Sequence, residues 1–155
     1  MKAPLNLPPS HEPWSAADAR LLLLTARSLK HAAGAGNGRP LLKGKKVALL
    51  CDQAHCGCGT AFDDAASALG AHVSRLHADA VMSPDAARLL GHLYDAIDCE
   101  HIAADATEAL KRNVNVPVYV GLGRADHPVM RLLEPGSSDE DRRYLRQALL
   151  LSTIG

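Results

Sequence analysis

Aromatic residues are scarce in this chain of 155 residues, which contains one Phe, one Trp and three Tyr. Leu, Val and Ala must therefore supply most of any buried core. Acidic and basic residues balance at 17 each, so the composition lacks the excess of positive charge that binds nucleic acid or anionic membranes. No apolar run approaches the roughly 18 to 20 residues that span a bilayer. These absences predict a protein whose partners are neither nucleic acids nor membranes.

Signs of secretion are also absent. Residues 1–14 are rich in Pro and lack the apolar segment of a secretory signal peptide. Four cysteines are too few for a disulfide scaffold in a chain of this length. Such a chain can bury about two thirds of its unfolded surface as one domain without cross-links. We therefore expect a cytoplasmic protein that folds as a single domain.

Strand-like and helix-like segments alternate along the chain. Apolar segments with the character of buried strands are found at 46–51, 72–76, 96–99 and 116–120. Segments with helical apolar spacing and helix-boundary residues are found at 15–33, 60–70, 83–94 and 105–113. This alternation is typical of a parallel sheet with helices on both faces, which is a three-layer αβα arrangement of the α/β class. In such sheets ligands bind beyond the carboxyl ends of the strands.

Three of the helical segments begin with residues that cap helices. Ser15 and Ser83 can accept hydrogen bonds from backbone N–H groups of the first turn. Ser15 is followed by Asp18, and Asp105 by Glu108, at the spacing of a capping box. We expect each of these residues to mark the beginning of a helix.

The chain divides into three parts by composition. Residues 1–14 form a Pro-rich leader, residues 15–134 an α/β domain, and residues 135–155 a hinge and a terminal helix that complete the same domain. The terminal helix has apolar residues at the spacing of a buried stripe, namely Leu145, Ala148, Leu149 and Ile154. We expect this stripe to pack on the leucine-rich face of the first helix.

A loop rich in cysteine and glycine follows the first strand and reads "CDQAHCGCGTAFDD" over residues 51–64. Its glycines lead directly into a helix, so the N–H groups of residues 57–60 and the helix dipole would favour a small anion. A Gly-x-Gly sequence before a helix is nevertheless a weak signal, because the same residues occur in loops without a ligand. Both interpretations, a small-anion site and an unoccupied loop, stay open at this point.

Four segments resemble, in the same order, the carbamoyl phosphate-binding domain of the aspartate/ornithine carbamoyltransferase family, and that of ornithine carbamoyltransferase in particular. They are "LLKGKKVALL", "AFDDAASALGAHVSRL", "DAARLLGHLYDAI" and "NVPVYVGL" followed by "HP". Residues 139–155 resemble the C-terminal helix of these enzymes, whereas their second, amino acid-binding domain is missing. The resemblance implies a Rossmann-like, four-stranded parallel sheet in the order 2-1-3-4 with the terminal helix packed on it. It also implies association as a homotrimer through this domain.

Most positions that bind carbamoyl phosphate in this family carry other residues here. Where the family has Ser-Thr-Arg-Thr-Arg, residues 55–59 read "HCGCG". The arginine of the family's Tyr-Arg-Gly motif falls at Glu100, and the glutamine of its His-Pro-x-Gln motif falls at Met130. The motif's His127 and Pro128 are retained. The resemblance thus gives the candidate ligand-binding residues His55, Cys56, Gly57, Cys58, Gly59, Thr60, His127 and Pro128.

The resemblance further implies that the cysteines converge on one crevice with neighbouring histidines. Thiolates and imidazoles are ligands of zinc and copper, so the former anion pocket would suit a soft metal ion or thiol redox chemistry. The candidate metal ligands are Cys51, His55, Cys56, Cys58, Cys99 and His101. Against this hypothesis, Cys-x-Cys is not the common zinc spacing, and cysteines at the ends of buried strands often act as small apolar residues.

Carbamoyl transfer needs positive charge around the phosphate and a donor aimed at the developing oxyanion. The missing arginines and the negative charge of Glu100 oppose both requirements. We therefore expect a half-length carbamoyltransferase homologue without transcarbamylase activity, which acts as a ligand- or partner-binding protein. Two alternatives stay open: a soft-metal (Zn or Cu) or thiol-redox protein, and a residual carbamoyltransferase-type enzyme of amino-acid metabolism.

Overall fold

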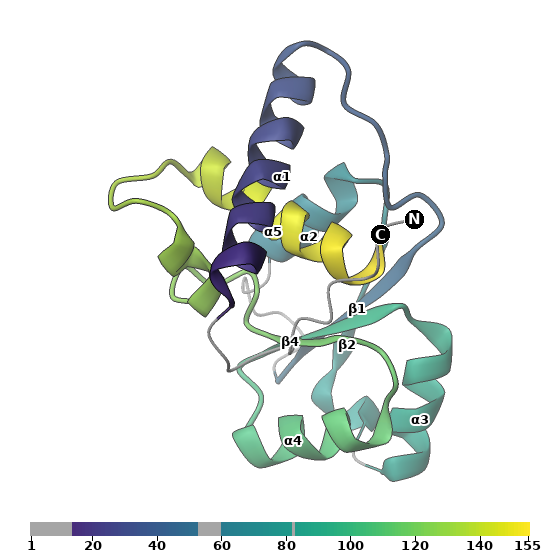
Figure 1. Ribbon diagram of the computed structural model, residues 1–155. Coiled ribbons are helices and arrows are strands. Elements are labelled where there is room, and N and C mark those ends of the chain that lie inside the picture. Colours follow the sequence, from purple (N-terminus) through teal and green to yellow (C-terminus); the bar gives the residue numbers. More distant parts are fainter. Residues whose placement is uncertain (1–13, 53–59, 82) are drawn as a thin grey trace.

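The computed structural model describes residues 14–52, 60–81 and 83–155 (Figure 1). Nearly all of the predicted Pro-rich leader and residues 55–59 of the cysteine- and glycine-rich loop therefore lie outside the described residues. Within the described ranges, strands and helices alternate as the sequence predicts. No helix in these ranges is long and apolar enough to cross a membrane.

A four-stranded parallel sheet forms the centre of the fold. Its strands are β1 (Lys46–Cys51), β2 (His72–His77), β3 (Ala96–Glu100) and β4 (Val118–Val120). They lie in the order β2-β1-β3-β4, which confirms the predicted topology. The central strands β1 and β3 are buried along almost their whole length, because helices cover both faces of the sheet. Their last residues, Cys51 and Glu100, are register partners at one end of the sheet.

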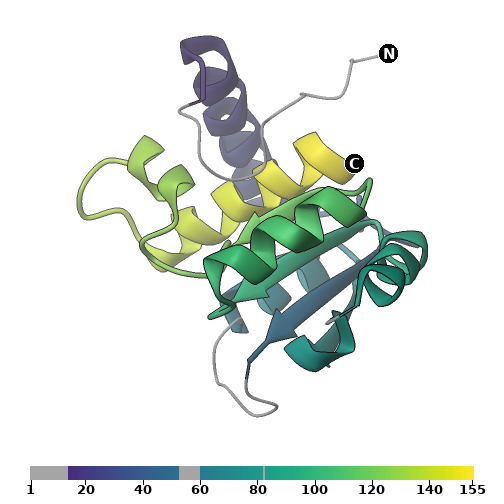
Figure 2. The ribbon, with the colours of Figure 1, turned by 90° about the horizontal axis from the view of Figure 1, so that it is seen from below.

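Helices cover the two faces of the sheet in two layers (Figure 1, Figure 2). On one face lie α1 (Ala16–Gly34), α2 (Thr60–Ala68) and α5 (Asp139–Ile154). On the other lie α3 (Pro84–Leu93) and α4 (Ala104–Asn113). Two short 3-10 helices, η1 (Ala78–Val81) and η2 (Pro128–Leu132), belong to the connections. The predicted three-layer arrangement with a terminal helix packed on the domain is therefore confirmed.

Successive residues of each strand supply separate cores on the two faces, because their side chains point to opposite sides. Leu49 of β1 belongs to the larger core, together with Phe62 of α2 and Leu145 of α5. Its neighbour Leu50 belongs to the smaller core, together with Leu110 of α4. The same alternation decides on which face each polar residue of β3 lies.

The terminal helix α5 packs against α1 and α2 and presents a continuous face to the larger core. Every residue of the predicted stripe is buried: Leu145, Ala148, Leu149 and Ile154. The helix begins at Asp139, because Ser138 and Asp141 form a capping box. The Asp141 amide donates to the Ser138 hydroxyl over 3.1 Å, and the Ser138 amide donates to the Asp141 carboxylate over 3.4 Å.

Two of the three predicted helix caps are present. The hydroxyls of Ser15 and Ser83 each accept a hydrogen bond of 3.1 Å from the backbone amide three residues on. The predicted capping box of Asp105 and Glu108 is wrong. Helix α4 begins with Ala103 at its cap position and has no side-chain cap. Asp105 consequently lies inside the first turn of α4, where its negative charge interacts favourably with the helix dipole.

Candidate functional site

The carboxyl end of β3 meets the loop after β4 and the beginning of α2. Glu100 is the last residue of β3, and Gly123 lies in the loop. A Cβ atom at position 123 would lie 3.2 Å from Oε1 of Glu100 and 3.0 Å from the backbone nitrogen of Phe62. A glycine is needed at so close an approach, and it lets the loop cover Glu100. This meeting point lies beyond the strand ends, where α/β sheets bind ligands.

Glu100 is a fully buried acid at this meeting point. Its relative exposure is 0%, and no N–H or O–H group of the other described residues donates a hydrogen bond to either carboxylate oxygen. A buried carboxylate without donors costs free energy, so the residue does not stabilise the fold. Because Glu100 stands where the family's Tyr-Arg-Gly motif has its arginine, the charge at this point is reversed.

Asp98 is a second buried acid on the same face of β3, two residues before Glu100. Its Oδ1 accepts a hydrogen bond of 3.1 Å from the backbone amide of Leu122. Burial raises the pKa of the Asp98 carboxyl well above its usual range, and the negative charge of neighbouring Glu100 raises it further. Asp98 therefore keeps its proton to a higher pH in the folded chain than in the unfolded chain.

Arg146 of α5 is a positive charge that interacts electrostatically with both acids of this pair. Its Nε donates to the carbonyl oxygen of Leu122 over 2.9 Å, and Nη2 donates to that of Gly123 over 3.3 Å. Burial lowers the pKa of the guanidinium, but an arginine remains a cation in proteins. The backbone of Leu122 thus links β3 to α5, because its N–H donates to Asp98 and its carbonyl oxygen accepts from Arg146.

Substitution of Asp98 by Asn is expected to stabilise the protein at neutral pH and to flatten the pH dependence of its stability. Because the folded pKa of Asp98 is raised, the unfolded chain releases this proton above about pH 4 while the folded chain keeps it. Folding stability therefore falls as pH rises from about 4 towards the folded pKa. Asn keeps the acceptor for Leu122 and offers Glu100 a permanent N–H donor.

Urea unfolding at about pH 5 and about pH 8 measures this effect. We expect Asp98→Asn to gain on the order of 1–3 kcal/mol over the parent at the higher pH, the range of one satisfied buried group. Asp64→Asn, at an exposed acid of α2, is the matched control and should follow the parent. Identical pH dependence in Asp98→Asn and the parent would contradict the assignment of a proton to Asp98.

The retained His127 has a structural function in the loop after β4. It is buried and caps η2, since its Nδ1 accepts a hydrogen bond of 3.1 Å from the Val129 amide. Pro128 occupies the first turn of η2, a position that does not need its missing N–H. The Trp14 ring lies against the imidazole, with ring centroids 6.4 Å apart. An acceptor at Nδ1 means that the neutral imidazole carries its proton on Nε2.

The structure does not bring Cys51 and Cys99 together, contrary to the sequence-based expectation of one crevice. Cys99 is the register partner of Leu50, one residue before Cys51. The two thiols therefore point to opposite faces, and Cys51 belongs to the larger core while Cys99 belongs to the smaller one. Burial raises the pKa of the Cys99 thiol to about 12, so the thiolate that binds soft metals hardly forms at neutral pH.

The other candidate metal ligands are divided between described and undescribed parts of the chain. His101 is exposed at the end of β3. Among the residues that the structure describes, no group of three or more His, Cys, Asp or Glu side chains could hold a metal ion. Residues 55–59, with the candidates His55, Cys56, Gly57, Cys58 and Gly59, lie outside the described residues. Thr60, the last residue of the predicted anion loop, is the first residue of α2.

His101 has a backbone conformation that favours glycine, with φ at +55°. It follows Glu100, and so stands where the family's Tyr-Arg-Gly motif has its glycine. A side chain in this left-handed region costs roughly 1–2 kcal/mol. We therefore expect His101→Gly to raise the free energy of unfolding by about 1 kcal/mol, measured by chemical denaturation. His92→Gly, inside α3, is the control and should destabilise by a similar amount. A loss of stability in His101→Gly would show that the histidine side chain makes a compensating contact.

Sequence reasoning missed Asp98 and Arg146. Each gave a signal, because a charged residue stood inside an otherwise apolar segment: Asp98 within "AIDC" and Arg146 within the stripe of the terminal helix. A charge at such a position is buried only with a partner or with a changed protonation state. This signal could have identified a buried polar cluster, although not which residues meet in it.

Comparison with known proteins identifies carbamoyltransferases as relatives of this chain. Residues 10–135 match the family model described as aspartate/ornithine carbamoyltransferase, carbamoyl-P binding domain. An ornithine carbamoyltransferase of Cutibacterium acnes is 34% identical over 128 residues, which cover 77% of this chain and 38% of the relative. A catabolic ornithine carbamoyltransferase of Streptococcus agalactiae is 35% identical over 127 residues, covering 78% and 38%. The chain thus spans about two fifths of the length of these curated relatives.

Solved carbamoyltransferase structures share this fold. The ornithine carbamoyltransferase from Pyrococcus furiosus has a TM-score of 0.61 and 27% identity, and the alignment covers 70% of this chain and 36% of that chain. The aspartate transcarbamoylase from Trypanosoma cruzi, solved in complex with phosphate, has a TM-score of 0.63 and 25% identity, with 80% and 41% covered. The observed sheet and its helical layers are therefore those of this group of enzymes.

Proposed function

Since the chain belongs to the aspartate/ornithine carbamoyltransferase family through its carbamoyl-P binding domain, we propose that it acts as a ligand- or partner-binding protein without transcarbamylase activity. The single observation that supports this proposal best is Glu100, a buried acid to which no described residue donates a hydrogen bond, at the position where the family motif has an arginine. An anion placed there meets a negative charge instead of a positive one.

The surroundings of Glu100 add to this argument. Asp98 is buried beside it, and the hydrogen bonds of Arg146 are directed to two backbone carbonyls. Asp98 adds no positive charge, and the two N–H groups of Arg146 that bind these carbonyls are not available to a phosphate. Catalysis of acyl transfer depends on such preorganised charges, and the loss of one oxyanion donor alone costs about 3 kcal/mol in the barrier.

The alternatives receive less support from the described residues. The soft-metal site predicted from the sequence includes both Cys51 and Cys99, and these two lie on opposite sides of the sheet. Residual carbamoyl transfer would need residues other than the family's arginines to bind the phosphate group. Association as a homotrimer, which the resemblance implies, and a cytoplasmic location belong to the proposal as expectations. Sedimentation of the full chain tests the first of these.

An assay with carbamoyl phosphate and ornithine tests the loss of activity. We expect no carbamoylated product above the uncatalysed rate at any protein concentration that can be reached. His127→Ala serves as the control, because it removes the retained motif residue and should leave this background unchanged. Turnover that is proportional to protein concentration and disappears in His127→Ala would overturn the proposal.

A further inference from the structure

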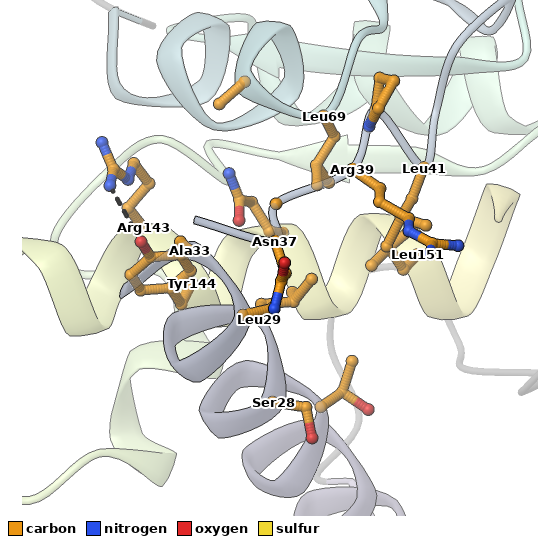
Figure 3. Close-up of a pocket in the computed structure, with 16 residues that line it drawn as sticks. Ser28, Leu29, Ala33, Asn37, Arg39, Leu41, Leu69, Arg143, Tyr144 and Leu151 are labelled. Atoms are coloured by element: carbon orange, nitrogen blue, oxygen red, sulfur yellow. Dashed lines mark hydrogen bonds between the residues drawn. The ribbon is translucent and has the colours of Figure 1, made fainter. Parts of the chain in front are cut away.

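A cavity lies between α1, α5 and the segment that follows α1 (Figure 3). Its volume of about 690 Å³ falls within the range of small-molecule sites, roughly 300–1,000 Å³. The apolar part of its lining comes from Leu29 and Ala33 of α1, Leu69 after α2, and Leu151 of α5. An apolar body of moderate length would therefore find a complementary surface in it.

The charges around this cavity all have the same sign. Its lining contains Arg39 and Arg143 and no Asp or Glu. Among the described residues, neither arginine forms an ion pair. Figure 3 shows Arg143 and Arg39 at opposite ends of the labelled side chains, with Leu29 and Asn37 between them. The cavity thus combines an apolar middle with positive charge at both ends.

Arg143 is the better placed of the two arginines to hold a ligand. Its guanidinium lies 5.1 Å from the centroid of the Tyr144 ring, and its Nη2 donates to the Tyr144 hydroxyl over 3.3 Å. These contacts hold the guanidinium in place, which lowers the entropy lost when it binds an anion. Its Nε–H is buried and has no acceptor among the described residues. A ligand acceptor would satisfy that side of the guanidinium.

We propose that this cavity binds a small amphipathic carboxylate. The carboxylate pairs with the guanidinium of Arg143, and the apolar body lies along Leu29, Ala33 and Leu69 towards Arg39. A carboxylate matches the forked geometry of a guanidinium, whereas a neutral molecule would leave both arginines without a counter-charge. The exposed Arg39 adds attraction at the other end. This cavity is separate from the strand-end site, which is the meeting point of β3, the loop after β4 and α2 around Glu100. The proposal for the cavity does not depend on the function proposed for the strand-end site.

Calorimetric titration of the full chain with decanoate tests the proposal, with decanol as the neutral ligand of equal chain length. We expect decanoate to bind at least about tenfold more tightly than decanol, as one charge-assisted hydrogen bond would give. Arg143→Gln should remove this preference, and Arg143→Lys should restore part of it. Arg20→Gln, at an exposed position of α1 outside the cavity, is the matched control and should leave both affinities unchanged.

A second variant tests the position of the apolar body. Ala33→Phe fills the cavity from an exposed helix position, so it should weaken both ligands without unfolding the chain, which circular dichroism verifies. Equal affinities of decanoate and decanol for the parent, or unchanged decanoate binding in Arg143→Gln or Ala33→Phe, would overturn the proposal. Self-association that occludes this face, detected by sedimentation as decanoate binding to dissociated chains only, would assign the cavity to a second copy and equally overturn it.

Discussion

Removal of residues 137–155 is expected to leave a chain that is insoluble or at most partly folded. The deletion removes the whole of α5, which buries these apolar side chains: Tyr144, Leu145, Ala148, Leu149, Leu150 and Ile154. Each large one contributes roughly 1.5–3 kcal/mol when buried, so their sum rivals the entire stability of a typical domain, about 5–15 kcal/mol. The hydrogen bond of 3.1 Å from Gln147 to the Ala65 carbonyl is lost as well.

A pair of leucine substitutions measures the same contribution in a graded form. Leu145 is 0% exposed in the larger core, whereas Leu24 of α1 is 51% exposed. Leu145→Ala should lower the free energy of unfolding by about 2–5 kcal/mol, and Leu24→Ala by less than about 0.5 kcal/mol. Equal losses in urea unfolding, or a melting temperature unchanged by the deletion, would show that α5 is a tail and not part of the core.

Replacement of Glu100 by Gln is expected to raise the affinity for inorganic phosphate by at least about tenfold, which corresponds to 1.4 kcal/mol. The substitution removes a negative charge from the meeting point of β3, the β4 loop and α2, and it provides an amide N–H in its place. Phosphorus NMR titration measures the change. Glu108→Gln, at an exposed acid of α4, is the control and should bind phosphate like the parent.

If Glu100→Gln bound phosphate no better than the parent, the charge reversal would not be what excludes anions. The replacement of the family's loop arginines by Gly57 and Gly59 would then be sufficient to explain weak anion binding. The comparison therefore separates the two departures from the family pattern.

Local patterns sufficed for most of the fold. The apolar segments at 46–51 and 96–99 predict β1 and β3 because strands buried on both faces need no alternation. The stripe of the terminal helix predicts the buried face of α5, since its spacing matches the helical period. Asp105 misled the prediction of a cap because the spacing of a capping box does not fix the residue at which a helix begins.

The candidate site depended on three-dimensional information that spacing does not contain. Cys51 ends β1, whereas Cys99 is the residue before the last in β3, and this register offset of one residue places the two side chains on opposite faces of the sheet. Asp98 and Arg146 lie 48 positions apart in the numbering and meet only through the Leu122 peptide. This cluster of Asp98, Leu122 and Arg146 forms because α5 packs against the loop that follows β4. The resemblance identified Glu100 because it compares positions, but it did not reveal the buried acid beside it.

Isothermal titration of the full chain with carbamoyl phosphate tests the central claim most directly, which is that the strand-end site no longer holds this anion. With a buried Glu100 in place of the motif arginine, we expect no saturable heat at any concentration below about the millimolar range, equivalent to binding weaker than about −4 kcal/mol. A micromolar dissociation constant, about −8 kcal/mol, with one site per chain would contradict the account, because other groups would then have replaced the missing arginines.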